Sequence, residues 1–333
     1  SKDRLRGCLL TSTPSPGIAP SPVLLLKLGD TADGSRPDRL ARSGTMTRIV
    51  RGVYADSAAW GALAPWERYL ARTHAVALST PGSVFCLESA AALRGHPVFG
   101  EPPHIHVLRV GEGTSRSSAT IREHTTHDSR ELEEIDGLLL TSLADTAVDL
   151  ARSRHAAVGL SSADAALRSD PYLSSAALRA TSERRTSSRG RRQARWSLRR
   201  ADARAANAME SISRAVIEWL GYAEPELQTQ VQVPQGDRYI DFFWRREGIG
   251  GEADGRWKYD GRFGDPTNIV YLEKRREDAI RQRLHGFARW VWPELISPRE
   301  LDDALARTGL RRIRPIDHAA LARLPQALRG YPR

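Results

Sequence analysis

The chain has 333 residues, of which 40% are hydrophobic, and it carries a formal net charge of +10. This length allows two or three domains with sizeable cores, and the basic balance favours a polyanionic partner such as nucleic acid. The two cysteines, Cys8 and Cys86, have neither metal-site spacing nor the pattern of a disulfide framework, which fits a reducing cytoplasm. The longest apolar runs are too short to span a bilayer, so we expect a cytoplasmic protein without a membrane partner.

Residues 1–22 are rich in Ser, Pro, Gly and Thr, a composition typical of a disordered tail. Residues 23–168 are expected to form the first folded module. It starts with a helical stretch at 37–42, followed by a break at Gly44, a β-branched run and a second break at Gly52. A helix, a turn and a small hairpin in this order are typical of the C-terminal end of a winged helix-turn-helix, although the preceding helices are short or missing.

The rest of this module contains patterns of both secondary-structure types. Apolar residues at helical spacing occur in Trp60–Val76, Ser89–Arg94, Leu143–Arg152 and Val158–Leu167. Apolar runs typical of strands occur in Val84–Leu87, Pro103–Val110 and Ala119–His124. Thr141 or Ser142 can cap the helix that begins at Leu143. The module is therefore predicted to be α/β or α+β.

Residues 169–205 form a strongly basic segment. Its arginines include Arg184, Arg185, Arg189, Arg191, Arg192, Arg195, Arg199 and Arg200. Turn-forming residues such as Ser187, Ser188 and Gly190 favour a loop or hinge within it. We therefore expect a basic linker or helical hinge at the main domain boundary. The arginines fit a solvated helix face or linker as well as a contact with phosphate groups.

Residues 206–333 are expected to form a second domain in which a helix, three strands, a helix and a strand follow one another. The corresponding segments are Met209–Leu220, Gln228–Val233, Tyr239–Trp244, Gly250–Asp254, Glu273–Leu284 and Phe287–Trp292.

Several acidic side chains fall next to apolar residues in this second domain. Glu252 and Asp254 should share one face of their strand, because strand side chains alternate. If Asp241 ends the neighbouring strand, the three carboxylates converge, and Glu210 could join them from the preceding helix. Such a group is costly unless a cation neutralises it, and oxygen-only ligands favour Mg²⁺ or Mn²⁺ over zinc.

A divalent ion at this place would suit phosphodiester hydrolysis, because it offsets charge on the phosphate and lowers the pKa of an attacking water. Lys258 is the nearest candidate for a cation that stabilises the developing charge. The competing interpretation is a set of ordinary ion pairs between these acids and nearby arginines or lysines. His104 and His106 also share a strand face and could ligate a metal, but no third ligand is evident.

Asp241 followed by Glu252-Ala253-Asp254 resembles the metal-binding core of the PD-(D/E)XK nuclease superfamily, in the branch similar to very-short-patch-repair endonucleases. The likeness covers roughly residues 206–295. It implies a restriction-endonuclease-like mixed sheet flanked by helices, with Glu210, Asp241 and Glu252 as Mg²⁺ ligands. Asp254 replaces the usual lysine of the superfamily. Either Asp254 is an extra ligand and Lys258 supplies the missing cation, or catalysis is impaired.

The first module resembles AbiEi-type antitoxins of bacterial toxin–antitoxin systems. The segments that carry this likeness are residues 48–54, 89–91 and 139–152. The resemblance implies a winged helix that binds DNA and represses transcription.

These observations lead to a primary hypothesis and two alternatives. The primary hypothesis is a Mg²⁺-dependent DNA endonuclease in a defence or toxin–antitoxin context. The first alternative is a non-catalytic DNA-binding regulator or antitoxin with an inactive nuclease fold. The second is a module that binds a toxin or defence-system protein.

Overall fold

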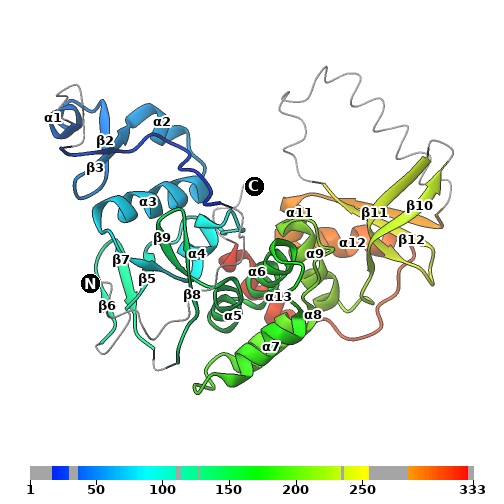
Figure 1. Cartoon of the computed structure of the whole chain (residues 1–333). Coiled ribbons are helices and arrows are strands. Elements are labelled where there is room, and N and C mark those ends of the chain that lie inside the picture. Colours follow the sequence, from blue (N-terminus) through cyan, green and yellow to red (C-terminus); the bar gives the residue numbers. More distant parts are fainter. Residues whose placement is uncertain are drawn as a thin grey trace. The chain divides into compact units, whose positions relative to one another are not determined.

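The computed structural model describes residues 17–29, 37–109, 114–126, 128–233, 236–254 and 284–328. Helices and three sheets form a mixed α+β fold, as the sequence predicts. The chain divides into two compact units (Figure 1). The first extends to Ala201 and includes Leu328, and the second extends from Asp202 to Ala327. None of the described helices has the length and hydropathy needed to cross a bilayer.

The first unit begins with a small sheet. Its strands, in the order β1–β3–β2, are β1 (Leu26–Lys27), β3 (Val53–Asp56) and β2 (Met46–Val50). Helix α1 (Pro37–Arg42) and the β2–β3 hairpin match the predicted order, with Gly44 and Gly52 in turns at positive φ. Asp56 then caps α2 (Ser57–Ala62) by accepting a hydrogen bond from the N–H of Ala59.

A six-stranded mixed sheet forms the centre of the first unit. In the order β6–β7–β5–β4–β9–β8, its strands are Arg116–Ser117, Ile121–His124, Ile105–Leu108, Val84–Phe85, Leu138–Thr141 and Leu132–Ile135. The sheet shares one apolar core with α3 (Pro65–Ser79) and α4 (Leu87–Leu93). Most of the expected disordered tail, residues 1–16, lies outside the described residues, but Ile18 packs against this core.

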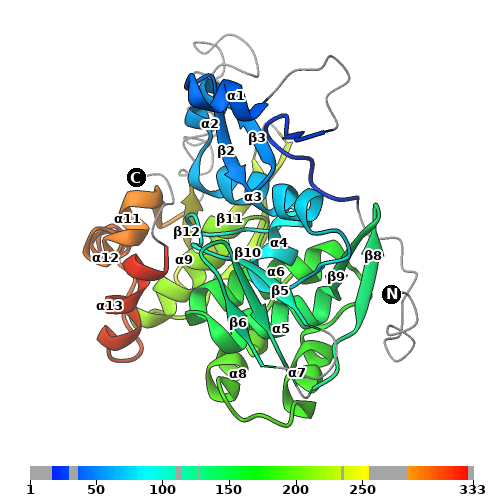
Figure 2. The same ribbon diagram turned by 90° about the vertical axis from the view of Figure 1, so that its left-hand side faces the viewer.

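Four helices complete the first unit: α5 (Leu143–Ser153), α6 (Ala156–Ser169), α7 (Ser175–Arg184) and α8 (Arg191–Arg200). Ser142 caps α5, as predicted, by accepting a hydrogen bond from the N–H of Asp145. The segment expected as a linker or hinge instead contributes α7 and α8, because Leu178, Ala194 and Leu198 are buried against the α5 and α6 core. These helices lie at the opposite end of the unit from α1 in both views (Figures 1 and 2).

The second unit contains a four-stranded sheet. In the order β10–β11–β12–β13, its strands are Glu226–Val233, Gly236–Trp244, Ile249–Ala253 and Gly286–Trp290. The first three are antiparallel, and β13 is parallel to β12. Helix α9 (Ala208–Trp219) packs on this sheet, where Ser213 accepts a hydrogen bond from the buried indole of Trp290 at 2.8 Å.

Three short helices follow the sheet: α11 (Trp292–Ile296), α12 (Pro298–Arg307) and α13 (His318–Ala327). The helix predicted at Glu273–Leu284 lies, apart from Leu284, outside the described residues.

Candidate functional site

Asp241 lies on β11 beside the acidic end of β12. The regular pairing of β11 with β12 includes Phe242 but does not extend to Asp241. Instead the Oδ2 atom of Asp241 accepts a hydrogen bond from the backbone N–H of Ala253 at 3.0 Å. Ala253, the last residue of β12, separates Glu252 from Asp254, so Asp241 is held beside this acidic pair at the end of the strand; we call Glu252 and Asp254 the acids of β12.

Glu210 is buried at the start of α9, with 3% of the residue exposed. Its Oε2 atom accepts hydrogen bonds from the N–H of Ala206 at 2.7 Å and from Nε2 of Gln228 at 3.2 Å. Its Oε1 atom accepts one from Nδ2 of Asn207, which is itself the N-cap of the helix. Glu210 therefore completes a reciprocal cap that stabilises the first turn of α9.

Gln228 links Glu210 to Asp241. Its Nε2 atom lies 3.2 Å from Oε2 of Glu210 and 3.0 Å from Oδ1 of Asp241, so one amide group donates to two carboxylates. Its backbone φ of 48° lies in the left-handed region, which is costly for a residue with a Cβ atom. The surrounding contacts therefore maintain an unfavourable backbone conformation at this position.

Arg289 neutralises the two acids of β12. It lies opposite Glu252 in the parallel pairing of β12 with β13. Its Nη2 atom is 3.0 Å from Oε2 of Glu252, and its Nε atom is 3.5 Å from Oδ2 of Asp254. Both acids therefore contact one guanidinium group, which agrees with the prediction that they share a face of the strand. All three side chains are largely buried.

Four predicted site residues thus meet in two linked pairs. Gln228 joins Glu210 to Asp241, Arg289 joins Glu252 to Asp254, and the bond from Asp241 to Ala253 connects the pairs. Their all-oxygen donor chemistry fits Mg²⁺ or Mn²⁺. Within the described ranges, no group of three or more acidic, histidine or cysteine side chains is arranged to hold a metal ion.

The sequence pattern does not single out the two residues that connect these acids. Gln228 is the first residue of a predicted strand, and Arg289 lies within the segment that resembles the nuclease branch. Their positions depend on strand register, which local patterns do not specify. Lys258, the cation suggested by the sequence, lies outside the described residues.

A second polar cluster lies in the core of the first unit. Nδ1 of His106 is 2.8 Å from Nε2 of His124, and Glu88 forms a bidentate ion pair with Arg154 beside them. Burial lowers the pKa of His106 to about 4, so its imidazole is neutral near pH 7. The sequence suggested His104 and His106 as a possible metal-binding pair. In the structure the partner of the His106 ring is His124, and the backbone carbonyl of His104 accepts a hydrogen bond from Tyr69.

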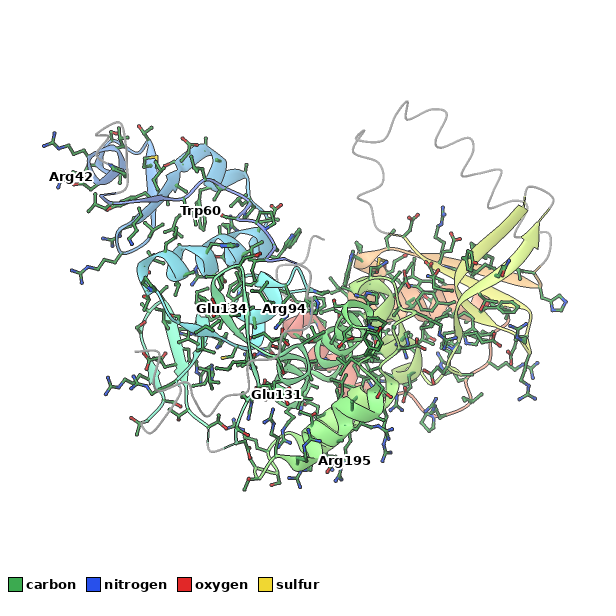
Figure 3. The ribbon with its side chains drawn as sticks, in the orientation of Figure 1. Arg42, Trp60, Arg94, Glu131, Glu134 and Arg195 are labelled. Atoms are coloured by element: carbon green, nitrogen blue, oxygen red, sulfur yellow. The ribbon has the colours of Figure 1, made fainter. Side chains whose placement is uncertain are left out.

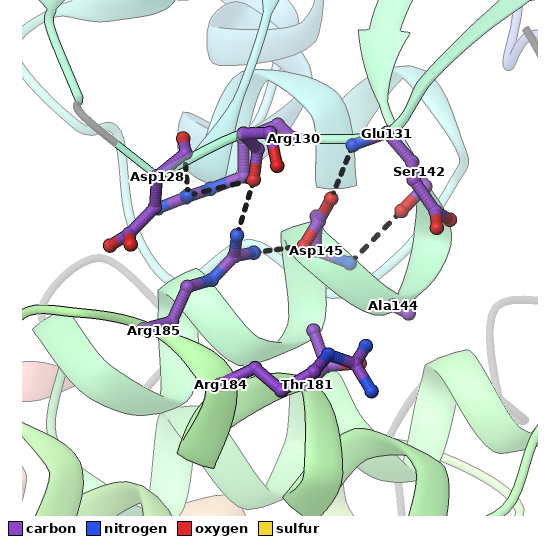
Figure 4. Close-up of a pocket in the computed structure, with 10 residues that line it drawn as sticks. Asp128, Arg130, Glu131, Ser142, Ala144, Asp145, Thr181, Arg184 and Arg185 are labelled. Carbon is purple, nitrogen blue, oxygen red and sulfur yellow. Dashed lines mark hydrogen bonds and ion pairs between the residues drawn. The ribbon is translucent and has the colours of Figure 1, made fainter. Parts of the chain in front are cut away.

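The first unit also contains a polar cavity of about 340 Å³ (Figure 4). It is lined by Asp128, Ser129, Arg130, Glu131, Ser142, Ala144, Asp145, Thr181, Arg184 and Arg185. Asp145 forms an ion pair with Arg185 and accepts a hydrogen bond from the N–H of Glu131 at 2.7 Å. Arg130 pairs with Asp149. These contacts tie α7 to α5 and pair the buried cations of the cavity with carboxylates.

Comparisons with known proteins find relatives but no assigned function. No family model and no solved structure matches the chain. Two relatives from Mycobacterium tuberculosis are Uncharacterized protein MT2308, from strain CDC 1551 / Oshkosh, and Uncharacterized protein Rv2248, from strain ATCC 25618 / H37Rv. Each is 35% identical over 210 residues, a match that covers 62% of this chain and 73% of the relative. The chain belongs to the family of these two uncharacterized mycobacterial proteins.

Proposed function

We propose that the second unit is a restriction-endonuclease-like domain that hydrolyses DNA phosphodiester bonds with Mg²⁺ or Mn²⁺. The observation that carries this proposal is the linked group of Glu210, Asp241, Glu252 and Asp254 at the junction of α9, β11 and β12. The order of elements also supports it. A helix precedes three antiparallel strands, and β13 returns parallel to β12. This arrangement agrees with the PD-(D/E)XK resemblance inferred from the sequence.

In this proposal Glu210, Asp241 and Glu252 would turn their carboxylates towards one ion, since the described side chains are not already arranged around one, and Asp254 would support them. The bound ion would offset phosphate charge and lower the pKa of a water molecule. Gln228 keeps two like-charged carboxylates close together by donating a hydrogen bond to each of them. The reciprocal cap of α9 fixes Glu210 at the helix end, which limits the motion of one ligand.

Arg289 takes the electrostatic role that the sequence assigned to Lys258. It is a cation that contacts both Glu252 and Asp254. A guanidinium group at this place can donate to phosphate oxygens and stabilise the negative charge that develops on them. Arg289 would then compensate for the lysine that Asp254 replaces in the superfamily pattern.

The alternative is a DNA-binding regulator or antitoxin whose nuclease-like unit does not cleave. Two observations favour it. The Arg289 guanidinium supplies a counter-charge to both acids of β12 from within the chain. In addition, α1 and the β2–β3 hairpin have the order expected at the end of a winged helix. This alternative predicts DNA binding that EDTA leaves unchanged.

Plasmid nicking distinguishes these functions. The wild-type chain should nick supercoiled DNA with Mg²⁺ or Mn²⁺, and EDTA should abolish the activity. Asp241→Asn should lose nicking, because the change removes charge with almost no change in shape. Glu226→Gln is the matched control, since this exposed acid of the same sheet pairs with Arg245 at the surface. Equal nicking by the wild type and Asp241→Asn would refute the proposed site, and binding without nicking would favour the regulator.

A further inference from the structure

Helices α7 and α8 and the turn between them carry a basic surface. We define this α7–α8 surface by its exposed arginines, which are Arg179, Arg184, Arg189, Arg192, Arg195 and Arg199. Figure 3 shows one of them, Arg195, at the outer side of α8. Arg192, Arg195 and Arg199 follow the i, i+3, i+7 spacing of a single helix face.

The opposite sides of these helices are buried, so the arginines face solvent. Leu178, Ala194 and Leu198 are fully buried in the core formed with α5 and α6. The outward side is therefore set by packing, and the charged face is a fixed feature of the first unit.

Positive charge on this surface greatly exceeds negative charge. Glu183 is its exposed acid, and it is bound by both Nε and Nη2 of Arg195, at 2.7 and 2.8 Å. Arg179, Arg192 and Arg199 form no ion pair with any residue that the structure describes. Within the described part of the chain, three exposed cations on two adjacent helices therefore lack a counter-charge.

A second layer of arginines holds the turn between α7 and α8. Arg152 donates hydrogen bonds to the carbonyl oxygens of Ser182, Ser187 and Arg189, and Arg191 donates to the carbonyl of Ser187. Burial and the neighbouring cations lower the pKa of Arg152. Arg152 is thus close enough to Arg191 and Arg185 for their positive charges to repel one another. A bound polyanion would offset this repulsion.

We propose that the α7–α8 surface binds the phosphate backbone of double-stranded DNA without regard to base sequence. A duplex carries about one charge per 1.7 Å of its axis. The axial separation of Arg192 and Arg199 is about 10 Å, so α8 alone can reach several phosphates.

The surface suits DNA better than a protein partner. Stable protein interfaces have an apolar core, whereas DNA interfaces are polar and strongly positive. A single-stranded partner is less suitable, because such partners stack their bases on open aromatic rings. Trp196, the aromatic residue of α8, instead has the Arg200 guanidinium 4.6 Å from its ring centroid.

This inference rests on the proposed function only in its choice of DNA as the partner. Binding can be measured with EDTA present, so it does not require cleavage. The test uses the full chain and a labelled 25-base-pair duplex, with fluorescence anisotropy measured over a series of salt concentrations.

The test variant is Arg192→Gln/Arg199→Gln, and the control is Arg116→Gln/Arg122→Gln. The control removes the same charge from exposed arginines on β6 and β7 of the six-stranded sheet. All four positions are exposed, and circular dichroism should confirm that both variants fold like the wild type. We expect the test variant to lose affinity by roughly tenfold or more and the slope of log K against log salt to fall by about 2. The control should change neither quantity to that extent.

Three results would overturn the inference. The first is equal loss of affinity in the two variants, because that would indicate net charge and not this surface. The second is wild-type affinity in the test variant. The third is tighter binding of single-stranded DNA or RNA than of the duplex. Because binding is measured in EDTA, a wild-type chain that binds the duplex but does not nick it would refute the proposed cleavage and leave this inference standing.

Discussion

Gln228 is the residue whose removal best tests the candidate site. Its amide donates to Glu210 and Asp241 at 3.2 and 3.0 Å. A hydrogen bond to a charged group contributes about 1.5–3 kcal/mol. One bond has the usual N–H···O length and the other lies at the long end of the range, and a single amide nitrogen donates both, so we take the lower figure for each. We therefore expect Gln228→Ala to lower the free energy of unfolding of the second unit by about 3 kcal/mol.

The backbone at this position makes the prediction more specific. Gln228→Ala keeps the cost of the left-handed φ of 48°, whereas Gln228→Gly relieves it. We therefore expect the glycine variant to be more stable than the alanine variant by roughly 1 kcal/mol, even though glycine usually destabilises a strand. Both variants should lose nicking activity, because the two carboxylates are no longer held together.

Hydrogen exchange of the β10 and β11 amides is the appropriate assay, because two compact units need not unfold in one step. Faster exchange in both variants, with the larger effect in Gln228→Ala, is the expected result. If both variants exchange like the wild type, Gln228 does not hold these carboxylates together. If alanine is the more stable substitution, the left-handed backbone at this position is not the source of the difference.

Three further predictions concern other parts of the chain. Arg289→Gln removes a cation that competes with a metal ion for the β12 acids, so it should tighten Mn²⁺ binding by roughly tenfold or more, measured by calorimetry. The same variant should reduce nicking. Unchanged Mn²⁺ affinity would contradict this. The folded-state pKa of His106 lies below its ordinary value of 6.5, at about 4, so the stability gained from keeping it neutral is complete above pH 6.5 and is lost as pH falls towards 4. That difference corresponds to about 3 kcal/mol, and urea unfolding of His106→Gln should show a weaker pH dependence over this range than the wild type. Gly159→Ala would place a Cβ atom 2.7 Å from Cα of Ala151. It should lower the free energy of unfolding by about 1–3 kcal/mol and therefore lower the thermal midpoint. Its control, Gly61→Ala, meets nothing within 4 Å and should not be destabilised; equal midpoints for the two variants would count against the close contact of α5 with α6.

Local features of the sequence predict many of the elements. Pro37–Arg42 forms a helix as expected, and the hydroxyl of Ser142 caps α5, because turn and capping signals act within a few residues. The strand pattern at Tyr239–Trp244 likewise falls within β11. Glu252 and Asp254 share a face because alternation is a property of any strand.

Long-range pairing accounts for what the sequence does not reveal. Arg289 meets Glu252 only because β13 runs parallel to β12 in one particular register. The α7 and α8 helices pack against α5 and α6 instead of forming a linker, because a few small and apolar residues among many arginines suffice to bury one side. Composition alone does not distinguish such a helix pair from a charged hinge.

The contact of Arg289 with both acids of β12 has a consequence for how this protein can be handled. An acidic centre with an internal counter-ion does not depend on a metal to hold its negative charges together. The second unit should therefore fold during synthesis before any ion arrives, and purification in a chelating buffer should yield intact material that can be reconstituted later.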